Sequence, residues 1–230
     1  MITARMPSTV SRRSNAGTRV ASLALALALA AGTLGAQGAD PDKPAAQGDK
    51  TMPAGWEMRL DRATADKSTL SFSASGPAMR VTSGPAAIYW NAKNAASGPF
   101  SAEASFTQLR KPSHAEAFGL IWGGKELLAD RQEYYYLIVR GDGKYMVKHR
   151  AGAETHELVP WTEHAAIIKE DASGVSKNAL KVESSPAGAK LYANGQLLKE
   201  LPGAGANGIV GVRVNHNLDV EITGFRVTPR

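Results

Sequence analysis

The sequence contains no cysteine among its 230 residues. Disulfides, thiol catalysis and thiolate metal sites are therefore excluded, and so is a lipid attached through an N-terminal cysteine. Histidine is scarce, with five residues, and no two of them have the i, i+4 spacing of a helical zinc protease. The Gly-x-Ser-x-Gly motif that carries the nucleophile of many serine hydrolases is also absent. The sequence names no reaction.

Long apolar runs are also lacking, apart from one run at residues 20–34. A membrane span needs about 20 apolar residues, so this run is short for an anchor. Arginines precede it, and small residues follow at Ala36 and Ala39, which is the layout of an export signal. We expect residues 1–39 to be a signal peptide. The protein would then be a bacterial periplasmic or secreted protein with no stable membrane span.

A concentrated positive charge is missing once this leader is set aside. The chain has 27 Lys and Arg against 21 Asp and Glu, and removing the four leader arginines leaves 23 against 21, a net charge of +2. Nucleic-acid binders usually keep a basic stripe. We therefore expect no nucleic-acid partner.

Residues 40–55 are predicted to be a flexible linker, because prolines occur there among Gly, Ala, Asp and Lys with no apolar period. The remaining segment, residues 56–230, is long enough to bury the core of one domain without covalent staples. It contains many short alternating segments, such as Phe100–Thr107, and no convincing helix. This pattern predicts an all-β fold, an antiparallel sandwich or barrel.

The most informative segment runs from Tyr134 to Arg150 and predicts two strands around Gly141-Asp142-Gly143. Because Gly143 tolerates a positive φ, we expect a three-residue loop that sets Arg140 opposite Lys144. Alternation then separates two faces. The face that suits a core carries Tyr135, Leu137, Val139, Tyr145, Val147 and His149. The face that mixes rings with cations carries Tyr134, Tyr136, Ile138, Arg140, Lys144, Met146, Lys148 and Arg150.

Four features together resemble the concanavalin A-like lectin and glucanase group, in its laminin-G-like jelly-roll branch. They are Phe118–Gly124, the Tyr134–Arg150 hairpin, the Tyr192-Ala193-Asn194-Gly195 turn, and Gly211–Val214 continuing to Phe225-Arg226-Val227. The resemblance implies a two-sheet antiparallel jelly-roll sandwich over residues 56–230. The resemblance indicates little about which reaction or ligand the protein has, because such folds host many functions.

Two sugar-cleaving families share this fold. Laminarinase-type glucanases carry Glu-x-Asp-x-Glu on one strand, and the nearest match here is Asn217–Glu221, whose first carboxylate is an amide. The exported 3-keto-disaccharide hydrolase-like family has a similar general layout, but its usual signatures are not found. A glycoside hydrolase acting on (3-keto-)disaccharides therefore remains the alternative function, without assigned catalytic residues.

The hairpin face with rings and cations is the candidate ligand site. Tyr136 is expected opposite Lys148 and Tyr134 opposite Arg150, and such rings stack on sugars while cations bind hydroxyl or carboxylate groups. The alternative is a solvated strand face on which Lys and Arg stems cover the tyrosines. Trp161 follows Pro160 in a loop-like stretch flanked by His156 and His164. The predicted ligand-binding residues are Tyr134, Tyr136, Arg140, Lys148, Arg150 and Trp161.

We therefore expect an exported module that binds a carbohydrate or another cell-envelope ligand and performs no catalysis. A structural or adhesive module is a second alternative. No cofactor is expected. A metal site assembled from distant strands stays open, with the Asp and Asn oxygen ligands that calcium prefers, while a histidine in a turn, such as His216, is usually solvated.

Overall fold

The computed structural model describes residues 52–230, so the predicted signal peptide and most of the predicted linker lie outside the described residues. Within this range the chain forms strands and a single short 3₁₀ turn, η1 (Lys67–Thr69). The strands are β1 (Trp56–Leu60), β2 (Ser71–Ser75), β3 (Ala78–Thr82), β4 (Ala87–Ala96), β5 (Phe100–Gln108), β6 (Ala117–Lys125), β7 (Glu133–Arg140), β8 (Lys144–Ala151), β9 (Glu154–Glu163), β10 (Ser176–Ser185), β11 (Gly188–Ala193), β12 (Gln196–Pro202), β13 (Gly208–Val214) and β14 (Asp219–Pro229).

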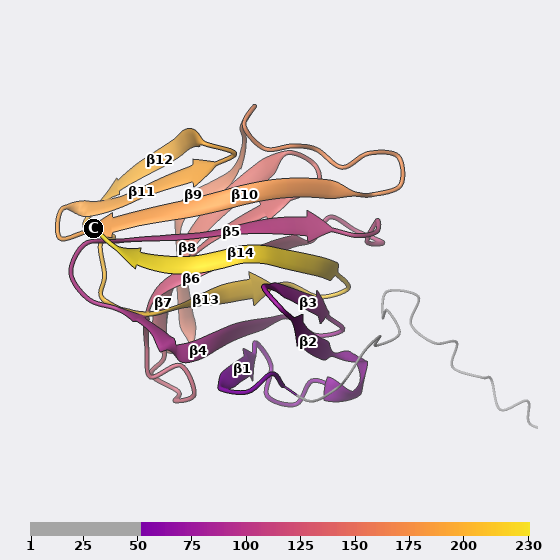
Figure 1. The fold of residues 1–230 in the computed structure, drawn as a ribbon, viewed down its shortest axis with the longest axis horizontal. Helices are drawn as coiled ribbons and strands as arrows, with labels where there is room; N and C mark the ends of the chain where they lie inside the picture. Colours follow the sequence, from indigo (N-terminus) through magenta and orange to yellow (C-terminus); the bar gives the residue numbers. More distant parts are fainter. Residues whose placement is uncertain (1–51) are drawn as a thin grey trace, which may run out of the picture. The chain divides into compact units, whose positions relative to one another are not determined.

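The strands make two seven-stranded antiparallel sheets that lie one behind the other in Figure 1. The first sheet has the order β1-β4-β13-β6-β7-β8-β9, and the second has the order β12-β11-β10-β5-β14-β3-β2. The predicted all-β antiparallel sandwich is confirmed. Neighbours in space are often distant in sequence: β13 lies between β4 and β6, and β14 lies between β3 and β5.

The main core fills the space between the sheets because strands of both sheets alternate apolar and polar residues. In β5 the buried apolar positions are Phe100, Ala102, Ala104 and Phe106, and the residues between them are partly exposed. Phe106 stacks on Phe118 of the opposite sheet with ring centroids 5.6 Å apart. Each fully buried phenylalanine of this kind contributes roughly 1.5–3 kcal/mol of transfer free energy.

The β7–β8 hairpin forms with the predicted register. Gly143 has φ +88°, its amide donates to the Arg140 carbonyl at 3.1 Å, and the loop between the strands is three residues long. Tyr134 pairs with Arg150, and Tyr136 pairs with Lys148. The predicted Asn194-Gly195 turn also forms, with φ of 50° and 81° that suit a two-residue hairpin loop.

The prediction that Trp161 lies in a loop is wrong. Trp161 belongs to β9, which pairs with β8 and forms one edge of the first sheet. Pro160 is tolerated there because an edge strand has amides that need no partner in the ladder.

Candidate functional site

The side of the first sheet that faces away from the main core carries a second apolar cluster, here called the outer cluster. A loop covers part of it: Leu127, in the β6–β7 connection, is 4% exposed and belongs to the cluster. Arg59 of β1 fastens this loop by donating to the carbonyls of Leu127 and Ala129, at 3.4 and 3.0 Å. The buried members of the cluster are Ile88, Trp90, Ala117, Ile121, Leu127, Tyr134, Tyr136, Ile138 and Met146.

The two tyrosines of the predicted ligand face are buried in this cluster. Tyr134 is 1% exposed and Tyr136 is 6% exposed, and their rings pack on each other with centroids 5.7 Å apart. Neither ring offers an open face on which a sugar could stack. The physical reason is the cover over the sheet, which alternation within the hairpin does not reveal.

The other predicted ligand residues are held by partners within the chain. The Arg140 guanidinium lies 4.2 Å from the centre of the Trp161 ring and donates to Asp142. Lys148 pairs with Glu157 at 3.9 Å across β8 and β9. Ligand binding by the six residues predicted above stays a prediction.

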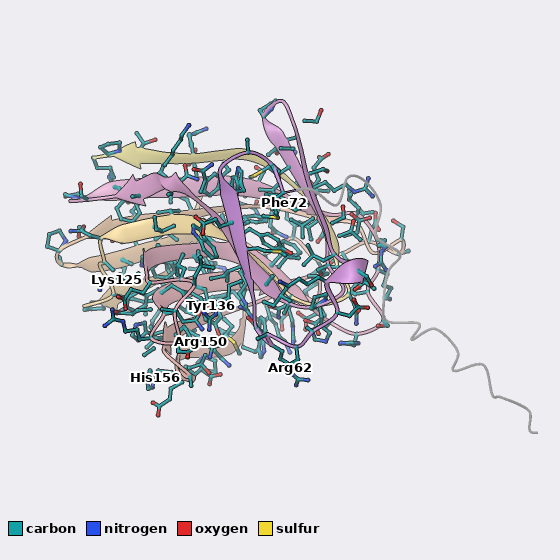
Figure 2. All side chains as sticks on the ribbon, turned by 90° about the horizontal axis from the view of Figure 1, so that it is seen from below. Arg62, Phe72, Lys125, Tyr136, Arg150 and His156 are labelled. Atoms are coloured by element: carbon teal, nitrogen blue, oxygen red, sulfur yellow. The ribbon has the colours of Figure 1, made fainter. Side chains whose placement is uncertain are left out.

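Arg150 and Tyr136 adjoin a feature that the sequence analysis did not identify, an ion pair between Arg213 of β13 and Asp61 after β1. The Arg213 Nη1 and Nη2 atoms donate to the Asp61 Oδ1 and Oδ2 atoms at 2.9 and 2.5 Å. The Arg213 Nε atom donates to Asn215 Oδ1 at 3.0 Å, and the guanidinium lies 5.0 Å from the Tyr136 ring centre. Figure 2 shows Tyr136 and Arg150 near each other on this side of the molecule.

This ion pair stays charged at neutral pH. Burial alone would raise the pKa of the Asp61 carboxyl, but the hydrogen bonds and charge of Arg213 outweigh it and lower that pKa below its ordinary value. Burial alone would lower the pKa of the Arg213 guanidinium, and Asp61 in turn outweighs that effect. Burial raises the pKa of the Tyr136 phenol. A bidentate arginine–carboxylate pair of this kind fixes both side chains in one geometry.

Asp61 and Arg213 stand in the wall of a pocket of about 640 Å³ at one end of the sandwich. Segments from three loop regions line it: residues 61–69 after β1, residues 84–86 between β3 and β4, and the end of β13 with the following turn. Ligand pockets commonly measure about 300–1,000 Å³. The polar lining residues are Asp61, Arg62, Thr64, Asp66, Thr69, Arg213, Asn215 and His216.

The pocket walls are held in place by hydrogen bonds between distant parts of the chain. The Asn215 amide donates to the Ala117 carbonyl at 2.9 Å, and the Ser83 hydroxyl donates to the Asn215 carbonyl. The Leu218 amide donates to Ser83 Oγ at 3.1 Å, and Asp66 caps η1 by accepting from the Ser68 amide at 2.8 Å. The pocket is therefore largely pre-formed.

A larger hollow, about 780 Å³, lies over β10, β11 and β12. Its charged residues neutralise one another in exposed pairs, such as Lys190 with Glu200 at 2.9 Å, where both side chains are more than half exposed. It lacks an ion pair with a buried partner such as Arg213, whose side chain is 8% exposed. We therefore regard the smaller pocket as the better candidate.

His216 at the edge of the smaller pocket also belongs to a possible metal-ligand set. Together with His114 and Glu116 it forms the one group of three or more metal-ligating side chains found among residues 52–230.

Comparison with solved structures identifies the fold. No family model and no curated protein matches the sequence. Solved structures do match: the carbohydrate-binding module CBM66 from Bacillus subtilis has a TM-score of 0.57 at 12% identity, over 76% of this chain and 95% of that one. The fold is the concanavalin A-like jelly roll.

Two lectin-like domains agree with this result. The exoplasmic/lumenal domain of VIP36, with Ca²⁺ and Man3GlcNAc bound, has a TM-score of 0.53 at 10% identity, over 76% of this chain and 84% of that one. The potassium-bound carbohydrate recognition domain of Emp46p has a TM-score of 0.51 at 12% identity, over 76% and 88%. The predicted resemblance to concanavalin A-like lectins is confirmed for the fold, and the resemblance to 3-keto-disaccharide hydrolases stays a prediction.

Proposed function

We propose that this chain is an exported carbohydrate-binding domain that holds its glycan in the pocket beside Asp61 and Arg213 and performs no catalysis. The observation that carries the proposal is the pocket itself, in which carboxylate, guanidinium, amide and hydroxyl groups converge from separate loops. Sugars present many hydroxyl groups, and fixed acceptors and donors of these kinds bind them with charge-assisted hydrogen bonds. The structural neighbours named above, several of which are carbohydrate-binding domains, support the same ligand class.

The absence of catalysis is part of the proposal, and the state of Asp61 argues against one catalytic role for it, that of general acid. A glycosidase needs a carboxylic acid that is protonated near neutral pH to protonate the leaving group. Arg213 lowers the pKa of the Asp61 carboxyl, so Asp61 is ionised at neutral pH and is unsuited to that role.

Export is proposed from the predicted leader at residues 1–39. Among the described residues, no helix is long and apolar enough to cross a membrane.

A glycan array followed by titration calorimetry tests the proposal. The pocket variant carries Arg62→Ala and Thr64→Ala, because both side chains line the pocket and are exposed, so their loss spares the core. The matched control is Lys190→Ala in the larger hollow. We expect the pocket variant to bind the selected glycan at least about tenfold more weakly, equivalent to about 1.4 kcal/mol, and the control to bind like the parent.

The predicted hairpin face is tested in the same assay by Lys148→Ala with Trp161→Ala. If this variant loses glycan binding while the pocket variant keeps it, the ligand binds on the predicted hairpin face and the pocket assignment is wrong. If the parent protein binds no glycan on the array, the proposed function itself is refuted.

A further inference from the structure

Three side chains from two separate segments converge at the end of the sandwich. His114 and Glu116 lie in the segment between β5 and β6, and His216 lies in the turn between β13 and β14. The Nε2 atoms of the two histidines are 3.0 Å apart. Glu116 Oε1 lies 2.9 Å from the Nε2 atom of His114 and 3.0 Å from that of His216.

Hydrogen bonding cannot account for all three of these contacts at once. If both Nε2 atoms carry a proton and donate to Glu116, the two protonated nitrogens face each other without an acceptor between them. If His114 instead donates to the Nε2 atom of His216, that nitrogen carries no proton for Glu116. A cation bound by all three atoms satisfies them together, because each then contributes a lone pair.

The burial of Glu116 also calls for a cation. Glu116 is 7% exposed, while the side chains of the two histidines are 46% exposed. Among residues 52–230, the ionic partners of this carboxylate are the two histidines. An imidazole supplies a positive charge only when it is protonated, whereas a bound divalent ion supplies one in every protonation state, and a buried carboxylate without a compensating charge is costly.

The surroundings hold the ligands in place. Ser113 Oγ lies 3.2 Å from His114 Nδ1, and a proton on Nδ1 shared with this hydroxyl leaves the Nε2 lone pair free for a metal. The Asn215 amide donates to the Ala117 carbonyl at 2.9 Å, which fixes the His216 turn beside the segment that carries Glu116. Arg110 adds a contact to the Asn217 carbonyl at 3.5 Å.

The ligand set selects the class of metal. Two imidazole nitrogens with one carboxylate oxygen suit zinc and its transition-metal neighbours, whereas calcium prefers oxygen ligands throughout. Tetrahedral zinc bonds of about 2.0–2.2 Å place ligand atoms about 3.3–3.6 Å apart. The three atoms would therefore move apart by a few tenths of an ångström, which the half-exposed histidines permit.

We propose that His114, Glu116 and His216 bind one divalent transition-metal ion of the zinc class. Three protein ligands leave a fourth position for water or for an oxygen of another molecule. The bound ion joins the β5–β6 connection to the β13–β14 turn, and therefore clips together two segments that are about one hundred residues apart in sequence. Because His216 also lines the candidate glycan pocket, the ion lies at the border of that pocket.

Calorimetric titration of the untagged, chelator-treated full chain with zinc chloride at neutral pH tests this proposal. No other histidine lies in the ligand set, so His114→Ala and His216→Ala are the variants, and His156→Ala is the matched control, because His156 is an exposed histidine that pairs with Glu154. We expect one zinc ion per parent chain, at least about tenfold weaker binding in both variants, and parent-like binding in the control. Cobalt(II) should give the visible absorption bands of a low-coordinate site in the parent and in the control only.

Thermal unfolding gives an independent readout. Zinc at one hundred times its dissociation constant raises the ratio of folded to unfolded parent protein about a hundredfold, so the melting temperature of the parent and the control rises and that of the variants does not. The proposal is overturned if the parent binds no stoichiometric zinc, or if His114→Ala and His216→Ala bind it as tightly as the parent. Circular dichroism of the variants without metal establishes that they are folded.

Discussion

Removing Asp61 leaves a buried positive charge without its partner, and the cost of that change can be estimated. The Arg213 side chain is 8% exposed and the Asp61 side chain is 30% exposed. Breaking a fully buried pair by removing one partner costs about 3–5 kcal/mol. Asp61 is partly open to water, and solvent screening reduces this cost. We therefore expect Asp61→Ala to lower the free energy of unfolding by about 2–3 kcal/mol.

Urea unfolding at neutral pH, followed by tryptophan fluorescence, measures this loss. In a thermal scan the same loss should lower the melting temperature by about 5–10 °C for a domain of this size. The matched control is Glu200→Ala, which removes an exposed pair with Lys190 at 2.9 Å and should cost about 0.5 kcal/mol or less. The double variant Asp61→Ala with Arg213→Met removes both charges, and should be more stable than Asp61→Ala alone.

The pH dependence gives the same reasoning a second test. Arg213 lowers the pKa of the folded Asp61 carboxyl below its ordinary value of 3.8. A lowered carboxyl pKa contributes stability above the unfolded pKa, and this contribution is lost as the pH falls through the folded pKa. The gap in stability between the parent and Asp61→Ala should therefore be constant near neutral pH and narrow below pH 3.8. The reasoning is refuted if Asp61→Ala costs no more than Glu200→Ala, or if the double variant is the least stable of the three.

Two further substitutions test the packing of the sheets. A Cβ on Gly119 would lie 2.0 Å from the Leu137 carbonyl oxygen on the neighbouring strand. Gly119→Ala should therefore lower the free energy of unfolding, measured in urea, by about 1–3 kcal/mol. An unchanged free energy of unfolding would contradict the close approach of the two strands. The Asn178 side chain accepts from the Ile168 amide, donates to the Ile168 carbonyl and accepts from Asn194. Asn178→Ala leaves these part-buried groups without their partner and should cost about 1 kcal/mol. We expect faster amide hydrogen exchange at Ile168, and unchanged exchange there would count against the network.

Local sequence signals were sufficient for the hairpins. The Gly143 loop and the Asn194-Gly195 turn depend on residues that tolerate positive φ, and strand alternation around them fixes which side chains share a face. The same alternation marked Phe100–Thr107 as a strand, which the structure shows as β5. Each of these features is decided within a window of a few residues, so one sequence is enough to predict it.

The candidate pocket could not be predicted in the same way because its residues are far apart in the chain. Asp61 and Arg213 are separated by 152 positions, and only the placement of β13 beside β4 and β6 brings them together. The one local signal was a lone arginine between Val212 and Val214, on the side of the strand away from the main core. The burial of Tyr134 and Tyr136 was missed for a related reason, because most members of their cluster, such as Trp90 and Leu127, lie outside the hairpin.

The placement of β13 and β14 has a consequence for the order in which the molecule can be made. Each of these strands sits inside a sheet and joins partners synthesised much earlier: β13 joins β4 to β6, and β14 joins β3 to β5. Until both have left the ribosome, each sheet is split into two pieces whose inner edges lack their partners. A nascent chain with such gaps cannot close its core, and closing it last requires long-range pairings that form slowly.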